Sequence, residues 1–223
     1  MTLSARLRDR AAPIWERELS HPFVQKLGDG TLEEEKFKVW LRQDYLFLIE
    51  YSRVLGLAAA RAEDLETMGR FADLLRATLR DEMDLHRRYA AMFGLTSDDL
   101  EAATPAPATR AYADFLVRVA YEGPLVAMVA ALLPCAWGYA EIASKLAARG
   151  TPPADDRYQD WIRTYSSPEF VAYVEWLRDL LDLLSDAMSG ADQKRLTEIF
   201  LTSSEHEMCF WDMAERMEEG RDQ

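Results

Sequence analysis

Cysteine and histidine are scarce in this chain, which has two and three of them among 223 residues. Two isolated cysteines cannot build a disulfide framework, and residues 1–9 lack the apolar segment of a signal peptide. A zinc-type cysteine pair, a glycine-rich phosphate loop and a serine-nucleophile elbow are also missing from the sequence. We therefore expect a protein of the reduced cytoplasm whose chemistry follows none of those motifs.

Positive charge is in short supply as well. Lysine and arginine number 26 against 39 aspartates and glutamates, so the formal net charge is −13 at pH 7. Nucleic acids and anionic membrane surfaces both require a basic surface on their protein partner, so we expect neither as a partner. The acidic excess is typical of helix surfaces that keep a globular protein soluble.

Strand patterns are absent too, because no segment sustains an alternation of apolar and polar residues with β-branched enrichment. Helical periodicity is common instead, as in the apolar face formed by Leu7, Ile14 and Trp15. We predict an all-α fold with eight or so helices in a single bundle-like domain over residues 1–223. The expected helices cover residues 4–18, 31–62, 64–93, 109–122, 124–149, 155–165, 168–189 and 191–220, with a short helix from residue 96.

Helix boundaries are marked by proline, glycine and capping residues. The dipeptide His21-Pro22 is expected to break the first helix, and Gly28-Asp29-Gly30 is predicted to be a turn. Thr31 is expected to cap the next helix, with Glu34 at the position of a capping box. Further along, the segment Gly150-Thr151-Pro152-Pro153 separates two predicted helices.

One long uncharged run covers residues 123–140 and contains the segment Leu132-Leu133-Pro134-Cys135-Ala136. Its length is near the ~18 residues that raise the question of a membrane span. Pro134, the small residues and the absence of a second such run favour a buried core helix instead. A proline inside a helix removes a backbone donor and kinks the helix, so the cysteine that follows can point into an internal cavity. Cys135 is therefore the first candidate for chemistry, whereas Cys209 is predicted to be a small core residue.

Two carboxyl groups are predicted to point inward. Asp44 lies one helical turn after Trp40 on an aromatic face, so it either pairs with an arginine of another helix or meets a ligand. Near the end of the chain, Glu207 shares a face with Ser203, whereas Glu205 falls on a different side and is expected to meet solvent.

Other candidate residues are less specific. His86 follows Glu82 by one helical turn, and such a pair either ligates a metal or forms a structural hydrogen bond. Four aromatic residues are compatible with a site but also with core or boundary positions: Phe47, Tyr112, Tyr139 and Tyr165.

Several short motifs follow one another along nearly the whole chain, and each of them is weak by itself. They are His21-Pro22-Phe23-Val24-Gln25, Gly28-Asp29-Gly30-Thr31-Leu32, Phe37-Lys38, Gln43-Asp44, Glu82-Met83-Asp84-Leu85-His86, Leu132-Leu133-Pro134-Cys135-Ala136-Trp137-Gly138-Tyr139, Trp161-Ile162-Arg163-Thr164-Tyr165, Ser203-Ser204, Glu207 and Phe210-Trp211. In this order and spacing, the sequence resembles the TenA family, whose members include thiaminase II (aminopyrimidine aminohydrolase) on the haem-oxygenase-like helical fold.

The resemblance implies a role for each matching residue. Cys135 matches the nucleophile of the family, Glu207 its catalytic glutamate and Asp44 the aspartate that binds the aminopyrimidine. Phe47 falls where many members carry an aromatic residue, often tyrosine, so one polar contact would be lost here while stacking remains. The tyrosines that match residues of the site are Tyr112, Tyr139 and Tyr165.

The implied reaction is hydrolytic displacement at the methylene on carbon 5 of a 4-amino-2-methylpyrimidine. An aminomethyl pyrimidine from thiamin degradation would give the hydroxymethyl pyrimidine that is used to rebuild thiamin, and cleavage of thiamin itself would be a related activity. This chemistry, by covalent catalysis at cysteine, requires no metal and no organic cofactor. Members of the family commonly form homotetramers, so the resemblance also implies a homo-oligomer.

The expected site contains an electrostatic conflict. A carboxylate beside a cysteine raises the pKa of the thiol and suppresses the nucleophile. Two acids near Cys135 would therefore oppose its implied role unless one of them is protonated at rest. We expect that proton on Glu207, or its transfer from the thiol to a carboxylate when substrate arrives.

Two alternatives remain open at the level of sequence. One is a metal-dependent oxidase on the same fold, which needs several ligands from different helices. The available ligands are His86, Glu82, His206 and Glu205 or Glu207. The other alternative is a non-catalytic regulatory or binding protein, although the acidic charge and the lack of a DNA-reading motif disfavour direct binding of DNA.

Overall fold

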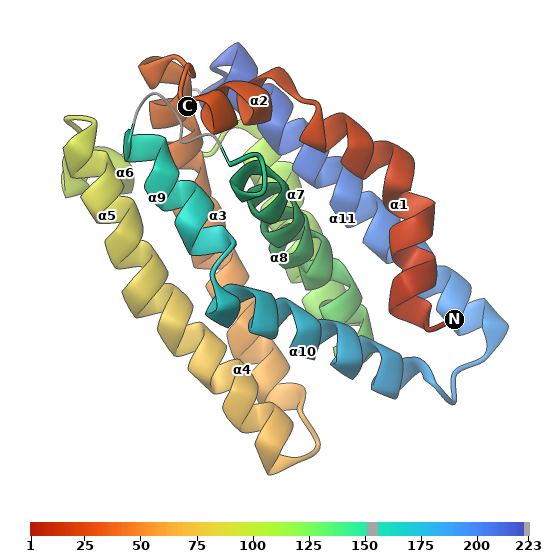
Figure 1. Ribbon diagram of the computed structural model, residues 1–223. Helices are drawn as coiled ribbons and strands as arrows, with labels where there is room; N and C mark the ends of the chain where they lie inside the picture. Colours follow the sequence, from red (N-terminus) through yellow and green to blue (C-terminus); the bar gives the residue numbers. More distant parts are fainter. Residues whose placement is uncertain (151–155, 221–223) are drawn as a thin grey trace. The chain divides into compact units, whose positions relative to one another are not determined.

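The computed structural model describes residues 1–150 and 156–220, and all regular secondary structure in these ranges is helical (Figure 1). This confirms the predicted all-α class, and these ranges contain more helices than expected. The elements are α1 (Leu3–Leu19), α2 (Pro22–Asp29), α3 (Glu34–Arg61), α4 (Leu65–Ala77), the π-helical turn η1 (Thr78–Glu82), α5 (Met83–Met92), α6 (Ser97–Glu101), α7 (Pro107–Glu122), α8 (Leu125–Ala147), α9 (Asp156–Tyr165), α10 (Pro168–Ser185) and α11 (Gly190–Arg216). The predicted separator at Thr151-Pro152-Pro153 lies outside the described residues.

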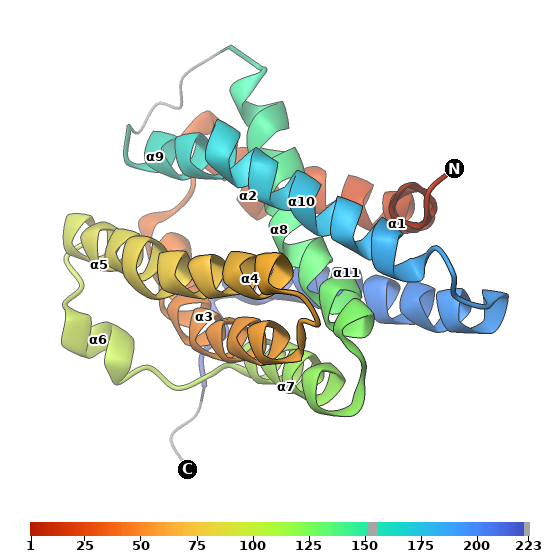
Figure 2. The same cartoon turned by 90° about the horizontal axis from the view of Figure 1, so that it is seen from below.

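The chain divides into two compact units. Unit 1 comprises Met1–Leu32 and Val129–Trp211, and unit 2 comprises Glu33–Met128 and Asp212–Gln223. Within unit 2, α3 packs against α4, α5 and α7 (Figure 1 and Figure 2). Within unit 1, α1 packs against α2 and α10, and α2 packs against α9. That the chain forms a single domain stays a prediction.

Helix α2 was not expected from the sequence. His21 is its N-cap, where Nδ1 accepts a hydrogen bond from the backbone N–H of Phe23 at 3.2 Å. Pro22 occupies the first helical position, where a missing N–H costs nothing because that group has no helical partner. The helix ends at Gly30, whose φ of 71° is left-handed. The dipeptide therefore ends one helix, as predicted, and also begins another.

Helix α3 begins later than the sequence indicated, so the predicted cap at Thr31 was wrong. The backbone N–H of Thr31 donates to the carbonyl of Lys26 at 2.8 Å and closes the end of α2. The N-cap of α3 is Glu33, which makes no capping hydrogen bond through its side chain. Glu34 and Glu35 favour this helix through their charge, because acidic groups in a first turn interact well with the helix dipole.

The segment predicted as one helix over residues 64–93 consists of α4, η1 and α5 in direct succession. The helical stretch stops before Gly94, whose φ of 74° is accessible to glycine at little cost. Thr96 and Asp99 then form a reciprocal capping box at the start of α6. Local signals were therefore sufficient for both boundaries.

Gln43 of α3 holds the segment that precedes α7. Its Oε1 accepts hydrogen bonds from the backbone N–H of Ala106 and from Oγ1 of Thr109, both at 2.8 Å. Its Nε2 donates to the carbonyl of Thr104 at 3.1 Å, and the side chain is 1% exposed. This single amide therefore satisfies three polar groups between Thr104 and Thr109.

Helix α8 is long and apolar enough to cross a membrane, judged by length and composition alone. Its most apolar window has a mean hydropathy of 1.7, and 78% of that window is buried inside the protein. A helix in the core of a protein can have the same length and apolar composition, and the burial of α8 agrees with the predicted core helix.

We expect Gln43→Leu to lower the free energy of unfolding by about 2 kcal/mol, because the N–H of Ala106 would remain buried without an acceptor. Urea denaturation followed by circular dichroism measures the change. Gln159→Leu is the control, since Gln159 is only partly buried and its side chain accepts one bond from Arg163. A loss of equal size in both variants would contradict the role of Gln43.

Candidate active site

Cys135 lies in α8 immediately after Pro134, which is inside the helix. Pro134 has no N–H, and its ring crowds the carbonyl groups of the preceding turn. The carbonyl of Ala131, in that turn, accepts a hydrogen bond from Oγ of Ser203 in α11 at 2.7 Å. Cys135 is partly exposed, whereas Leu133 is completely buried. Cys135 is therefore more accessible than the residues just before it in the helix, and a reactive cysteine requires such access.

Glu207 points inward from α11, as predicted. It is 3% exposed, and Ser203 and Ser204 on the same helix are completely buried. The side chain of Glu205 is 53% exposed, which confirms that it meets solvent. The prediction for Cys209 was wrong, because this residue is exposed.

Tyr139 and Tyr165 belong to one aromatic cluster of unit 1. Their ring centroids are 5.0 Å apart and their planes are nearly perpendicular. Tyr139 also stacks on Trp211 with centroids 5.2 Å apart, and Trp161 lies 4.9 Å from Tyr165. Such a cluster offers flat apolar surfaces of the kind that bind heteroaromatic rings.

Phe47 of α3 and Tyr112 of α7 form a second aromatic pair, which lies within unit 2. The two rings stack with centroids 4.7 Å apart, and the residues are 2% and 1% exposed. The predicted aromatic candidates therefore form two groups, one in each unit.

The carboxyl group of Asp44 is paired with the imidazole of His86 in α5. Oδ2 of Asp44 lies 2.6 Å from Nε2 of His86. The histidine is completely buried and the aspartate is 5% exposed. Of the two alternatives left open by the sequence, an arginine partner or a ligand, the structure shows neither at Oδ2, which is paired with a histidine. The expected contact between His86 and Glu82 is made through the backbone, because Nδ1 lies 2.9 Å from the carbonyl oxygen of Glu82.

The carbonyl of Glu82 determines the protonation of His86. A carbonyl oxygen only accepts hydrogen bonds, so Nδ1 carries a proton. The short contact between Nε2 and the carboxyl group of Asp44 then requires a second proton between these two atoms. The pair as a whole is electrically neutral, which lowers the cost of its burial. Glu82 ends the π-helical turn η1, and π-helical turns occur often at functional sites.

The metal ligands considered from the sequence are not assembled in the described residues. Within residues 1–150 and 156–220, no group of three or more histidine, cysteine, aspartate or glutamate side chains could hold a metal ion. His86 is held by Asp44 and by a backbone carbonyl. Glu205 instead lies 3.9 Å from Arg17 at the surface.

The candidate residues divide between the two units. Two buried ionisable groups were missed by the sequence analysis, namely His86 as the partner of Asp44 and Glu18 of α1. Unit 1 contains Cys135, Tyr139, Tyr165 and Glu207, and unit 2 contains Asp44, Phe47 and Tyr112.

Known proteins are similar to this chain over nearly its whole length. The model of the TENA/THI-4/PQQC family matches residues 8–217. A relative from Halalkalibacterium halodurans named aminopyrimidine aminohydrolase is 46% identical, with 97% of this chain and 98% of the relative covered. A relative of the same name from Helicobacter pylori is 39% identical, with 96% of this chain and 99% of the relative covered.

Solved structures agree with this similarity. A TenA homologue from P. horikoshii has a TM-score of 0.90 at 33% identity, with 97% of this chain and 99% of that chain covered. A domain from Shewanella denitrificans with a haem-oxygenase-like fold has a TM-score of 0.72 at 14% identity, with 96% and 92% covered. The fold predicted from the resemblance is therefore confirmed.

The pair of Asp44 and His86 predicts a pH dependence of stability. Burial lowers the pKa of His86, but the hydrogen bond and charge of Asp44, together with Glu82, raise it above the ordinary 6.5. The folded chain therefore keeps a proton that the unfolded chain releases near pH 6.5. The stabilising contribution is fully present below that pH and is lost as the pH rises through the folded pKa.

We expect the free energy of unfolding of the wild-type chain to fall over this range and that of His86→Gln to change less. The glutamine keeps a neutral donor towards Asp44 but cannot gain or lose a proton. Urea denaturation at a series of pH values above and below 6.5 measures both curves. Parallel curves would contradict the assignment of a bound proton to this pair.

Proposed function

Because the chain belongs to the TENA/THI-4/PQQC family, we propose that it is an aminopyrimidine aminohydrolase that acts in thiamin salvage. The observation that carries this proposal is the nearly full-length match to relatives of that name. The substrate is an aminomethyl pyrimidine with an amino group on carbon 4 and a methyl group on carbon 2. The aminomethyl pyrimidine and water give the hydroxymethyl pyrimidine and ammonia. Cleavage of thiamin at the same methylene is the related second activity.

Cys135 is the proposed nucleophile. Its thiolate adds to the electron-poor ring, and the electron pair moves towards the exocyclic carbon and expels the amine. Water then adds to that carbon, and the thiolate leaves with its electron pair, which restores the ring. The proton that water loses balances the proton that the departing amine gains. The partial exposure of Cys135 within a buried segment supports this role.

Glu207 is the proposed acid. A carboxylic acid that protonates a ring nitrogen makes the ring a better acceptor for the thiolate. The same group recovers its proton when the ring is restored. The burial of Glu207 supports this role, because an apolar environment favours the protonated form of a carboxyl group.

Asp44 is the proposed group that binds the aminopyrimidine edge. Its Oδ2 is engaged by His86, which leaves Oδ1 as the acceptor for an N–H group of the substrate. The rings of Phe47 and Tyr112 belong to the proposed binding surface, where Phe47 contributes stacking without a hydroxyl group. Tyr139 and Tyr165 supply further aromatic surface.

The remaining parts of this proposal come from the family resemblance. The reaction uses no metal and no organic cofactor, because the thiol and the carboxyl groups supply the nucleophile and the proton. The chain assembles as a homotetramer and works in the cytoplasm, on a small molecule and without nucleic acid or membrane partners.

The proposal predicts product formation that depends on Cys135. We expect the wild-type protein to release hydroxymethyl pyrimidine faster from the aminomethyl pyrimidine than from thiamin. Cys135→Ala should reduce both rates to background, because the covalent step is lost. Cys209→Ala is the matched control, since it removes the exposed thiol and should leave the rates unchanged. Product analysis by liquid chromatography measures the rates, and wild-type turnover by Cys135→Ala would overturn the nucleophile assignment.

Glu207 and Glu205 provide a second matched pair on one helix. We expect Glu207→Gln to lower kcat by roughly 10²–10⁴-fold, because the amide cannot supply a proton. Glu205→Gln alters an exposed carboxylate and should keep most of the activity. The rate of alkylation of Cys135 against pH gives a further measurement. An alkylation profile that is identical in wild type and Glu207→Gln would mean that the thiol and this acid are not coupled.

A further inference from the structure

A second buried acid, Glu18 in α1, has no part in the proposed reaction. It is 2% exposed, and its Oε1 has no hydrogen-bond partner among the described residues. An unpaired buried carboxylate is expensive, so such a group requires a reason for its presence.

The packing of α1 on α11 brings Glu18 close to Glu207. Nε1 of Trp15 donates a hydrogen bond to Oγ of Ser204 at 3.0 Å. Both helices lie side by side and run in the same direction (Figure 1 and Figure 2). Glu18 follows Trp15 by three residues, and Glu207 follows Ser204 by three residues. Because residues three apart share a helix face, both glutamates lie on the faces through which α1 and α11 meet, and Glu207 is the charge with the largest effect on Glu18.

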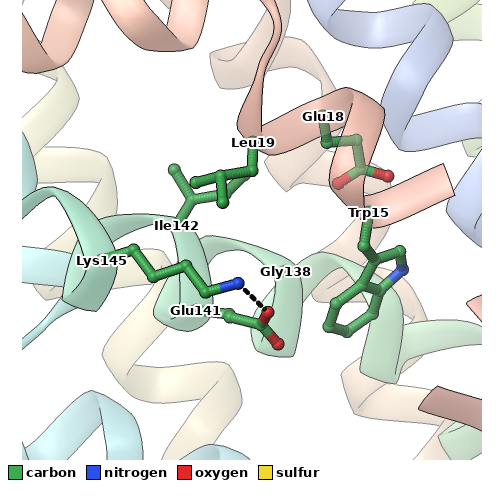
Figure 3. A pocket seen from close by; sticks show the side chains of 7 residues that line it. All are labelled: Trp15, Glu18, Leu19, Gly138, Glu141, Ile142 and Lys145. Carbon is green, nitrogen blue, oxygen red and sulfur yellow. Dashed lines mark hydrogen bonds and ion pairs between the residues drawn. The ribbon is translucent and has the colours of Figure 1, made fainter. Parts of the chain in front are cut away.

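Glu18 also lines a small open pocket between α1 and α8 (Figure 3). Its cavity volume is about 10 Å³, roughly the space of one water molecule. Oε2 of Glu18 lies 3.7 Å from the position that a Cβ would occupy at Gly138, three residues after Cys135. The other lining residues are Trp15, Leu19, Glu141, Ile142 and Lys145. The pocket lies beside the side chain of Glu18, which is itself buried.

The charges around Glu18 favour its protonated form. Burial raises the pKa of Glu18 well above 4.5, and Glu207 raises it further. Glu205 and Glu141 act in the same direction, and Arg8 opposes them. Arg8 binds Glu141 through two hydrogen bonds of 2.9 and 2.6 Å, and Lys145 also binds Glu141 at 2.6 Å. Arg8, the positive charge that acts on Glu18, is therefore engaged with another carboxylate.

We propose that Glu18 and Glu207 form a buried pair of carboxyl groups that holds one proton between the two residues at neutral pH. Two carboxyl groups in close proximity and apolar surroundings do not both ionise, since the second charge is repelled by the first. The role of the pair in catalysis rests on the proposed function, whereas the shared proton does not.

The shared proton resolves the conflict at the thiol. With one proton on the pair, Glu207 remains available as an acid, and unit 1 carries one negative charge fewer near Cys135. Glu18 acts through Glu207 and not on the substrate, so it is a positioning residue.

The first test compares the pH dependence of kcat in wild type, Glu18→Gln and Glu16→Gln. In the wild type, we expect kcat to fall at high pH because the shared proton is lost, and this fall is the high-pH limb of the profile. Glu18→Gln removes the repelling carboxylate, so we expect this limb to move to lower pH by about one unit while KM stays within about twofold. Glu16 is exposed on the same helix, and its variant should follow the wild type. A Glu18→Gln profile that superimposes on the wild type would overturn the proposal.

The second test does not depend on activity. The folded chain keeps a proton on Glu18 that the unfolded chain releases above pH 4.5, so wild type should lose stability relative to Glu18→Gln as the pH rises. We expect this difference to shrink in a Glu207→Gln background, because the neighbouring charge is absent. If the effect of Glu18→Gln on the pH dependence of stability is the same with Glu207 present and in the Glu207→Gln background, the proposed pair is overturned, whether or not the protein turns over aminopyrimidines. Glu18→Met also removes the charge and serves the same comparison if the amide does not fold.

Discussion

The burial of acidic side chains is the constraint on which the rest of this structure depends. Glu18, Asp44 and Glu207 are each at most 5% exposed among apolar helices. A carboxylate in such surroundings is unstable unless a partner or a proton neutralises it. Asp44 is paired with the imidazole of His86, and the proposed pair of Glu18 and Glu207 keeps a proton of its own. In the proposed function, the same neutralisation that permits burial also supplies the acid of the reaction and lowers the negative charge that would oppose a thiolate at Cys135.

The fold was predictable wherever a short segment determines its own structure. The capping box at Thr96 and the left-handed Gly94 stop and start helices by themselves, so both boundaries were correct. The start of α3 was not predictable in this way, because the N–H of Thr31 is used to close α2. Helix α2 is also short, and a proline at this position indicates the end of α1 as readily as the start of a new helix.

The sequence predicted which site residues point inward, but it did not predict which residues they contact. The helical face of Glu207 was correct because the spacing of Ser203 and Ser204 determines it. The histidine partner of Asp44 was not among the alternatives drawn from the sequence, since His86 is 42 residues away and only the packing of α3 on α5 brings it close. Glu18 had a visible signal, because it follows Trp15 of the apolar face by three residues. The proposed partner of Glu18 lies on α11, and no local pattern in the sequence of α1 reveals that the two helices pack together.

The most direct measurement of the central claim is neutron diffraction from crystals grown in heavy water at neutral pH. We predict one deuteron on the carboxyl groups of Glu18 and Glu207, one on Nδ1 of His86 and one between Nε2 and Asp44. Two bare carboxylates at Glu18 and Glu207 would contradict the account, because the proposed pair requires one proton.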